Sequence, residues 1–217
     1  MGRQPPVSVE AAGSRGRRRR DPAATKANLL AAALKLLERD GVLAGLNLNE
    51  VAAESGVNRG QIYQYFGSRR ALLRAALGDM TGRWHEARIF HEDRSLPFAR
   101  RRLKVFQEAL KNTTFIQLEA LLALDGDDQL SLFPWLADSR RDLARDKSTG
   151  ALAPEVDEVV AHAATATIYL GYSVFRQVLA RDLGLEVDEL DRRMVPIVAA
   201  MIKGAGNPGP HTDHSPS

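Results

Sequence analysis

The chain has 217 residues, of which 44% are hydrophobic, and it contains no cysteine. This composition is ordinary for a globular protein, and it excludes disulfides, thiolate metal sites and a cysteine nucleophile. Residues 1–74 hold thirteen Lys and Arg against six Asp and Glu, whereas residues 75–217 hold seventeen against twenty-one. A basic N-terminal part joined to a slightly acidic remainder is typical of a nucleic-acid-binding domain carried by a second domain.

No apolar run follows the N-terminal arginines, so the sequence predicts no signal peptide. The longest uncharged stretch, residues 159–175, is marginal in length for a membrane span and contains His162, Thr165, Thr167 and Ser173. We interpret it as a helix buried between protein surfaces. We therefore expect a cytoplasmic protein with no membrane partner, which also fits the lack of cysteine.

The first twenty residues contain Pro, Gly, Ser and Arg without periodicity, and we expect them to be disordered in isolation. They end in a basic run formed by Arg17, Arg18, Arg19 and Arg20. Such a run is either a flexible arm that binds DNA phosphates or enters the minor groove, or a solvated charge run with no fixed partner. Its place directly before the helices described next favours the arm.

Asp21 followed by Pro22 predicts the start of a first helix, which should end near Arg39 because Asp40 and Gly41 follow. Its apolar side is predicted from the spacing of Ala27, Leu30, Leu34 and Leu37.

Two short helices and a tight turn follow within residues 46–66. Asn47 can cap the first of them, with Glu50 completing a capping box three residues later. Gly56 stands where a left-handed C-terminal cap needs a residue without Cβ. Asn58 and Gln61 have the spacing of a second capping box. Two capped helices separated by about four residues form the helix-turn-helix pattern.

The second of these helices, residues 59–66, has two different faces. Ile62 and Phe66 lie one turn apart and predict an inward row. The outer face carries long hydrogen-bonding groups and one glycine, namely Arg59, Gly60, Gln61, Tyr63 and Gln64. Gln can pair with adenine and Arg with guanine in a major groove, and the N-terminal end of such a helix reaches the bases. Ser68 then caps a third helix whose Arg69 and Arg70 predict a phosphate clamp.

The segment GVNRGQIYQYFGSRRALL, residues 56–73, closely resembles the signature of the TetR family. The matching positions are Gly56, Val57, Gly60, Ile62, Tyr63, Tyr65, Phe66, Ser68 and Leu72. Arg69 departs from the usual Lys but keeps the charge, and the loop at residues 41–46 is about one residue longer than usual, which affects the expected angle between the first two helices. The resemblance covers residues 25–76, and beyond them only length and helical texture agree.

The outer face and the resemblance together predict a set of DNA-binding residues. They are Lys26, Asn47, Arg59, Gly60, Gln61, Tyr63, Gln64, Tyr65, Ser68 and Arg69, with Arg17, Arg18, Arg19 and Arg20 of the arm. The alternative is a structural helical hairpin, which explains Ile62 and Phe66 but not an exposed Gln-Gly-Gln-Tyr surface beside arginines.

The remainder reads as helices at residues 69–88, 98–111, 113–124, 129–146 with a break near Pro134, 154–181, and 185–203 with a kink at Pro196. No strand pattern is present, so we predict an all-α protein of about nine helices. The predicted domains are an arm (1–20), a helix-turn-helix domain (21–68), a helical ligand-binding and dimerisation domain (69–203) and a disordered tail (204–217). The turn at residues 125–128 lacks the later ligands of a calcium loop.

The resemblance implies an effector pocket and a dimer interface in the second domain. The candidate pocket residues are Trp84, Phe106, Phe115, Gln117, Leu118, Leu122, Trp135, Tyr169, Tyr172 and Phe175. The candidate dimer residues are Ala161, Ala164, Ile168, Gly171, Val187, Leu190, Met194, Ile197 and Met201. For each aromatic the alternative is ordinary core, and for the last two helices it is packing within one chain.

No catalytic or metal-binding motif is found, and we expect neither an enzyme nor a cofactor. The resemblance implies a homodimeric repressor that binds a palindromic operator and is released by a partly apolar small molecule. The alternative is an architectural or nonspecific DNA-binding protein without an effector, which a large core without a cavity would favour.

Overall fold

The computed structural model describes residues 21–42, 46–86 and 95–206, and these residues form nine helices and no strand. The helices are α1 (Pro22–Asp40), α2 (Leu48–Ser55), α3 (Arg59–Phe66), α4 (Arg69–Glu86), α5 (Phe98–Lys111), α6 (Thr113–Leu124), α7 (Leu136–Ser148), α8 (Glu158–Asp182) and α9 (Val187–Gly206). The predicted all-α class is confirmed. The arginine arm and the tail from residue 207 lie outside the described residues.

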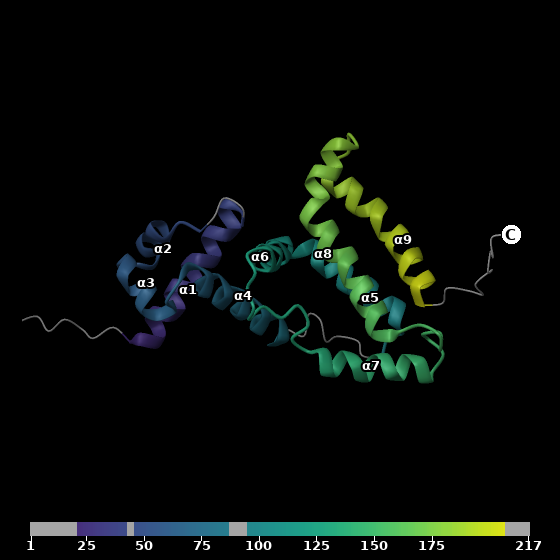
Figure 1. Cartoon of the computed structure of the whole chain (residues 1–217). Helices are drawn as coiled ribbons and strands as arrows, with labels where there is room; N and C mark the ends of the chain where they lie inside the picture. Colours follow the sequence, from purple (N-terminus) through teal and green to yellow (C-terminus); the bar gives the residue numbers. More distant parts are fainter. Residues whose placement is uncertain (1–20, 43–45, 87–94, 207–217) are drawn as a thin grey trace, which may run out of the picture.

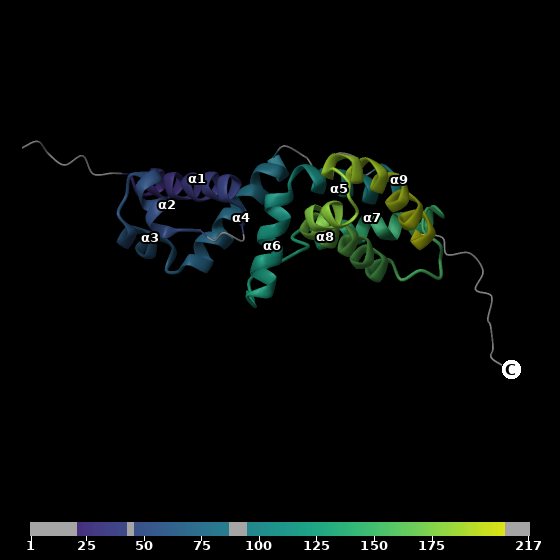
Figure 2. The same cartoon turned by 90° about the horizontal axis from the view of Figure 1, so that it is seen from above.

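Figures 1 and 2 show α1–α4 gathered in one body and α5–α9 in a second body beside it. The first body and α6 share one hydrophobic cluster, in which Leu29 and Leu37 of α1 meet Val51 of α2, Ile62 of α3 and Leu72 of α4. The same cluster continues through α4 to α6. Helix α4 therefore belongs to both bodies. On α1 the predicted apolar row is wrong at Ala27, which is exposed.

The second body is built around α5, which packs against both α8 and α9. Phe106 of α5 and Tyr172 of α8 contact each other within a second cluster, with ring centroids 5.6 Å apart. Tyr172 donates to Asp191 of α9 at 2.8 Å, and Arg176 of α8 pairs with the other oxygen of that carboxylate at 2.7 Å. These half-buried contacts fix the α8–α9 pair on α5. No described helix is both long enough and apolar enough to cross a membrane.

The predicted helix starts are largely confirmed. Asp21 caps α1 and Asn58 caps α3 through their side-chain oxygens, and Gly56 ends α2 in the left-handed region with φ 68°. Asn47 caps α2 as predicted, but it accepts from Asn49 N at 3.0 Å, and the predicted capping box with Glu50 does not form. Glu50 accepts from the side-chain amide of Asn47 and from Arg39 of α1, so it joins the two helices and does not bond the Asn47 backbone.

Two predicted boundaries in the second body are wrong. Residues 129–135 form turns and extended backbone, not a helix, and α7 begins only at Leu136. Pro134 has no N–H and disfavours helical backbone before it. Helix α8 begins at Glu158 and not at Pro154, because the Asp157 carboxylate caps it by accepting from Val159 N and Val160 N at 3.0 Å.

Candidate DNA-binding face and ligand cavity

The outward side of α3 is formed by polar side chains. Arg59, Tyr63 and Gln64 are exposed, whereas Ile62 is fully buried and Phe66 packs against the first cluster. The helical period produces this division, since Ile62 and Phe66 lie one turn apart and Gln64 lies opposite Ile62. Arg59 Nη2 donates to Tyr63 Oη at 3.5 Å, which is the long limit for a hydrogen bond. The guanidinium therefore remains able to donate to a better acceptor.

Two predicted DNA-contact residues, Gly60 and Gln61, take part in the N-terminal cap of α3. Gln61 N donates to Asn58 Oδ1 at 3.0 Å, and Asn58 N donates to Gln61 Oε1 at 3.4 Å. The side chain of Gln61 is thus engaged within the helix start. Gly60 is exposed, but a Cβ there would lie 3.2 Å from Asn58 Oδ1, so the glycine also makes room for the cap.

Three further predicted contact residues surround α3. Lys26 is exposed on α1, with Nζ 5.7 Å from the centroid of the Phe66 ring. Asn47 is exposed as the N-cap of α2. Tyr65 is half-buried against the first cluster, so less of its side chain faces solvent than that of Tyr63.

The start of α4 differs from the predicted clamp of two arginines. Ser68 Oγ accepts from Ala71 N at 3.0 Å and caps the helix, as expected. Arg69 is exposed and donates through Nε to the carbonyl of Leu46 at 3.2 Å, which leaves the rest of its guanidinium open to solvent. Arg70 is paired with Asp125 at 2.5 Å. Only Arg69 of the two is therefore without a carboxylate partner in the part of the chain described.

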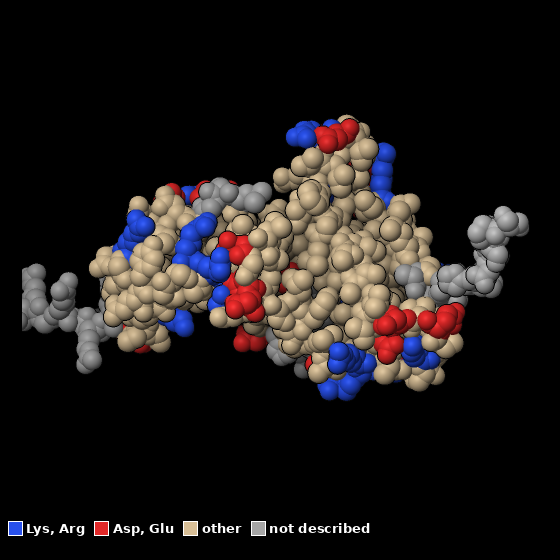
Figure 3. All heavy atoms as spheres, in the orientation of Figure 1, with Lys and Arg blue, Asp and Glu red and all other residues tan. Residues whose placement is uncertain are grey.

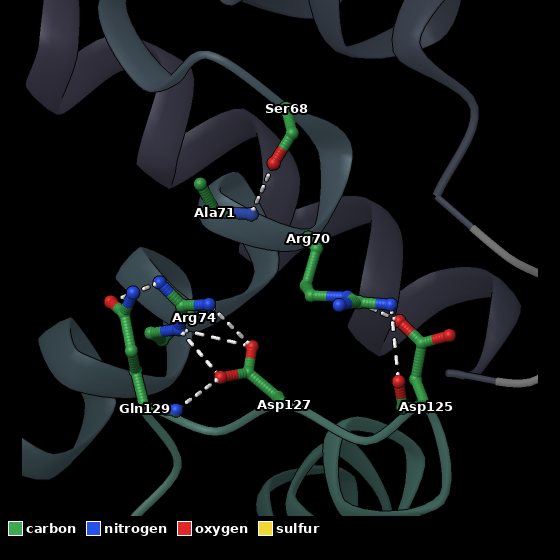
Figure 4. A network of polar contacts seen from close by, with 7 residues as sticks. All are labelled: Ser68, Arg70, Ala71, Arg74, Asp125, Asp127 and Gln129. Atoms are coloured by element: carbon green, nitrogen blue, oxygen red, sulfur yellow. Dashed lines mark hydrogen bonds and ion pairs between the residues drawn. The ribbon is translucent and has the colours of Figure 1, made fainter.

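A polar network joins α4 to the turn after α6 (Figure 4). Besides the Arg70–Asp125 pair, Arg74 donates to both oxygens of Asp127 through Nε at 3.0 Å and Nη2 at 2.7 Å. Arg74 Nη1 also donates to Gln129 Oε1 at 2.6 Å, and Gln129 N donates to Asp127. The hydrogen bonds from Arg74 lower the pKa of Asp127. The predicted turn at residues 125–128 thus ties the two bodies together, and we call these contacts the α4–α6 network.

A cavity of about 160 Å³ lies beside α4, and its walls come from α4, α5, α6, α7, α8 and the segment leading into α7. Leu77, Thr81 and Trp84 supply the α4 wall, and the rest of the lining is divided about equally between apolar or aromatic side chains and polar or charged ones. We call this space the central cavity. Pockets that combine an apolar wall with converging polar groups are usual for small organic ligands. The described residues contain no group of three or more His, Asp or Glu arranged to hold a metal ion.

Two arginines on α5 border the central cavity in different states. Arg101 is buried and pairs with Asp146 of α7, with Nη2 2.5 Å from Oδ2. Arg102 contacts His162 of α8, with Nη1 2.8 Å from Nδ1. Burial, then the neighbouring Arg101, lowers the pKa of Arg102 to about 10, which still leaves it protonated at neutral pH. Burial and the adjacent Arg102 lower the pKa of His162 to about 4, so its imidazole is neutral.

Two acidic groups in the cavity are held uncharged by their surroundings. Glu119 of α6 is buried, and desolvation raises the pKa of its carboxyl to about 8. Tyr169 of α8 lies beside it, and burial with the Glu119 charge raises the pKa of the phenol to about 12. Both groups are therefore mainly protonated at neutral pH and can donate hydrogen bonds.

The structure brings four of the ten predicted pocket residues to the cavity wall: Trp84, Phe115, Trp135 and Tyr169. It does not bring the other six there. Leu118 and Leu122 lie in the first cluster, Phe106 and Tyr172 in the second, and Gln117 on α6 away from the wall. Phe175 is 58% exposed on the outer side of α8.

The sequence did not predict the charged wall residues or the histidine: Arg101, Arg102, Lys104, Glu119, Asp138, Asp142 and His162. Glu119 had a usable signal, because it is the sole charged residue in α6 and stands between Leu118 and Leu122. An acid within a continuous apolar helix is either buried or placed for a function.

The outer side of α8 and α9 is apolar and exposed. Val160, Phe175 and Val178 of α8 and Ile197 and Met201 of α9 are exposed large apolar side chains, and Figure 3 shows few charges on much of the surface of the second body. Of the predicted dimer residues, Ala164, Gly171, Ile197 and Met201 are exposed or partly exposed. The others, Ala161, Ile168, Val187, Leu190 and Met194, pack in the second cluster of their own chain.

Comparison with known proteins agrees with this architecture. The family model described as bacterial regulatory proteins, tetR family, matches residues 29–76. TetR from Acinetobacter baumannii AYE has a TM-score of 0.58 at 19% identity, covering 87% of this chain and 99% of that one. Salmonella enterica GusR has a TM-score of 0.60 at 14% identity, covering 86% and 97%. A transcriptional regulator of Streptomyces coelicolor, SCO4942, has a TM-score of 0.57 at 21% identity, covering 82% and 97%. Comparison with curated protein sequences gave no match.

A helix-turn-helix body with a polar outward helix, joined through a shared helix to an all-α body, is the fold that these regulators share with this chain. Residues 29–76 thus match the tetR-family model, and the fold of the whole chain is similar to that of solved regulators of this kind.

Proposed function

We propose that the protein is a homodimeric repressor that binds a palindromic operator and leaves it when a small molecule occupies the central cavity. The observation that carries the proposal is the position of α4. It contributes Leu72 to the cluster that holds the recognition helix, and Leu77, Thr81 and Trp84 to the cavity wall.

In this proposal α3 lies in the major groove. Arg59 and Gln64 would contact base edges, Tyr63 and Arg69 would contact phosphates, and Gly60 would let the backbone approach the DNA. The exposure of all five residues supports the assignment. Basic side chains of that body also lie on its surface in Figure 3, where they can meet phosphates.

The outer side of α8 and α9 is the proposed dimer interface. No charged residue occurs from Val159 to Phe175, and the small residues Ala164 and Gly171 would allow close helix approach. An exposed apolar face of this kind marks a protein contact surface in soluble proteins. In the dimer, α8 and α9 of the two chains would form a four-helix bundle that buries this apolar face. Two recognition helices held at a fixed spacing would then read the two half-sites of a palindrome.

The proposed link between ligand and DNA is the movement of α6 relative to α4. A ligand in the central cavity would touch both helices, and the α4–α6 network would carry a shift of α6 to Arg70 and Arg74 at the start of α4. A changed α4 alters the spacing of the two recognition helices, so both half-sites can no longer be engaged at once. The presence of a cavity favours this function over nonspecific DNA binding without an effector.

The test begins with the sequences that the full chain selects from a random duplex library. We expect a palindrome, tight binding to the full site, weak binding to either half, and a dimeric mass by light scattering. Selection of no sequence, or equal affinity for full site and half-site, would contradict the proposal. Fractionated small-molecule extracts can then be assayed for release of the labelled operator, and the absence of any releasing compound would favour a regulator without an effector.

A further inference from the structure

The walls of the central cavity suit a compact ligand with a ring. Trp84 and Phe115 contact each other with centroids 3.9 Å apart, and Phe133 packs on the His162 ring at 4.7 Å. Trp135 lines the same space. A cavity of ~150 Å³ lined by apolar side chains is known to hold benzene, and the central cavity has about 160 Å³. One aromatic or alicyclic ring fits it without rearrangement.

Three of the charged side chains at the cavity wall are matched by a neighbour of opposite sign. Arg101 is paired with Asp146. The two α7 carboxylates at the wall, Asp138 and Asp142, are paired with arginines of the same helix, Arg141 and Arg145. These pairs leave no free carboxylate of α7 to attract a cationic ligand.

Arg102 differs from these paired residues. Its hydrogen-bond partner is the neutral imidazole of His162, and it forms no ion pair with any described residue. An arginine always donates, so His162 Nδ1 is the acceptor and the ring proton lies on Nε2. Neither Arg102 Nε nor His162 Nε2 has a hydrogen-bond partner within the described ranges. The wall near α5 and α8 therefore has a cation and an excess of donors, while Glu119 on the α6 side is uncharged at neutral pH.

We propose that the central cavity binds a compact, largely apolar organic anion, whose ring lies among the aromatic side chains and whose carboxylate pairs with Arg102. Tyr169 and the Glu119 carboxyl group supply neutral donors for a further oxygen on such a ligand. A guanidinium and a carboxylate form strong, charge-assisted hydrogen bonds, and burial strengthens the attraction. The inference rests on the proposed effector role of the cavity, but binding itself is measured without DNA.

The experiment compares acids with their uncharged counterparts by calorimetric titration of the full chain at pH 7. The probes are benzoate, phenylacetate and 1-naphthoate, each paired with its primary amide, and 1-naphthylmethylamine as a cation. We expect at least one acid to bind about tenfold or more tightly than its amide. Arg102→Gln should abolish this preference and Arg102→Lys should keep part of it. Arg100→Gln, which removes the same charge from the exposed side of α5, should leave it unchanged.

Three results would overturn the inference: no acid binding at millimolar concentration, amides binding as well as acids, or a preference for acids that survives in Arg102→Gln. Tighter binding of the amine, abolished in Glu119→Gln, would assign the cavity to cations instead. If Arg102→Gln does not fold, the acid and amide comparison in the unaltered protein still decides. Release of the operator is a separate readout. If acids bind through Arg102 but do not release the operator, the proposed effector mechanism is refuted and the anion site stands. If a non-acidic compound that binds the cavity releases the operator, the effector mechanism stands and the proposal of an anionic ligand is refuted.

Discussion

Replacing Asp146 with alanine should cost more stability than any exposed substitution, because it leaves a buried cation without its counter-charge. Asp146 accepts from Arg101 Nη2 at 2.5 Å and from Nη1 at 3.3 Å, and the two side chains are 2% and 10% exposed. Without the carboxylate, Arg101 keeps one acceptor, the Leu96 carbonyl at 2.7 Å. Removing one partner of a buried pair typically costs about 3–5 kcal/mol.

The assay is urea unfolding followed by circular dichroism at one fixed protomer concentration, because dimer dissociation would otherwise shift the midpoint. Asp182→Ala is the control. Its pair with Arg181 is exposed, at 60% and 73%, and its removal should cost less than about 1 kcal/mol. The double change Arg101→Met with Asp146→Leu should recover much of the stability, since it removes the stranded charge. A cost below about 1 kcal/mol for Asp146→Ala, or a double variant as unstable as the single one, would refute the reasoning.

Four further predictions address DNA binding, assembly and pH. Arg59→Ala and Gln64→Ala should each lower the ratio of operator to random-DNA affinity, by roughly 1–3 kcal/mol per base contact, in gel shifts at fixed salt; an unchanged ratio would exclude that residue from base reading. Gly171→Arg should place a charge in the dimer interface, and light scattering should show monomers or misfolded protein; an intact dimer would move the interface elsewhere. Because the pKa of Glu119 is raised to about 8 in the folded state, the native protein binds the extra proton, and its unfolding free energy should fall as pH rises from 4.5 towards 8. Glu119→Gln should flatten that slope, and an unflattened slope would assign it to other groups. Deleting residues 1–20 should reduce the slope of log affinity against log salt by about 0.9 for each phosphate that the arm neutralises in the intact protein, and identical slopes would make the arginines a solvated run.

The first body could be predicted from the sequence because its signals are local. A capping residue, its partner three residues later and a glycine in the left-handed region act within one turn of helix, as Asn58, Gln61 and Gly56 do. The failure at Glu50 has a tertiary cause. Its carboxylate binds a guanidinium of α1 that only the folded chain brings near, in place of the backbone of Asn47.

The cavity could not be predicted in the same way, because its polar residues are defined by tertiary packing. Arg101 and Arg102 look like ordinary surface residues in a basic helix, and only the packing of α7 and α8 against α5 buries them. Phe106 and Tyr172 look equally suited to a pocket, but they face each other in the second cluster. The aromatic residues of the sequence therefore indicated that a core and a pocket exist, but they did not indicate which side chain belongs to which.

The architecture explains how a ligand of modest affinity could act on DNA binding. A ligand shifts a two-state equilibrium only by its difference in affinity for the two states, and a tenfold difference is worth about 1.4 kcal/mol per site. Two cavities in a dimer double that effect. In the proposed mechanism Arg74 and Asp127 offer one route for such a shift beside the apolar contacts of α4 with α6, since they bind α4 to the turn after α6 (Figure 4). A hydrogen-bonded pair of this kind transmits a displacement of α6 to α4, whereas the exposed Arg70–Asp125 pair beside it, at 45% and 53% exposure, is weakened by solvent. From these positions we expect that Arg74 couples the two bodies, whereas Arg70 mainly positions the start of α4.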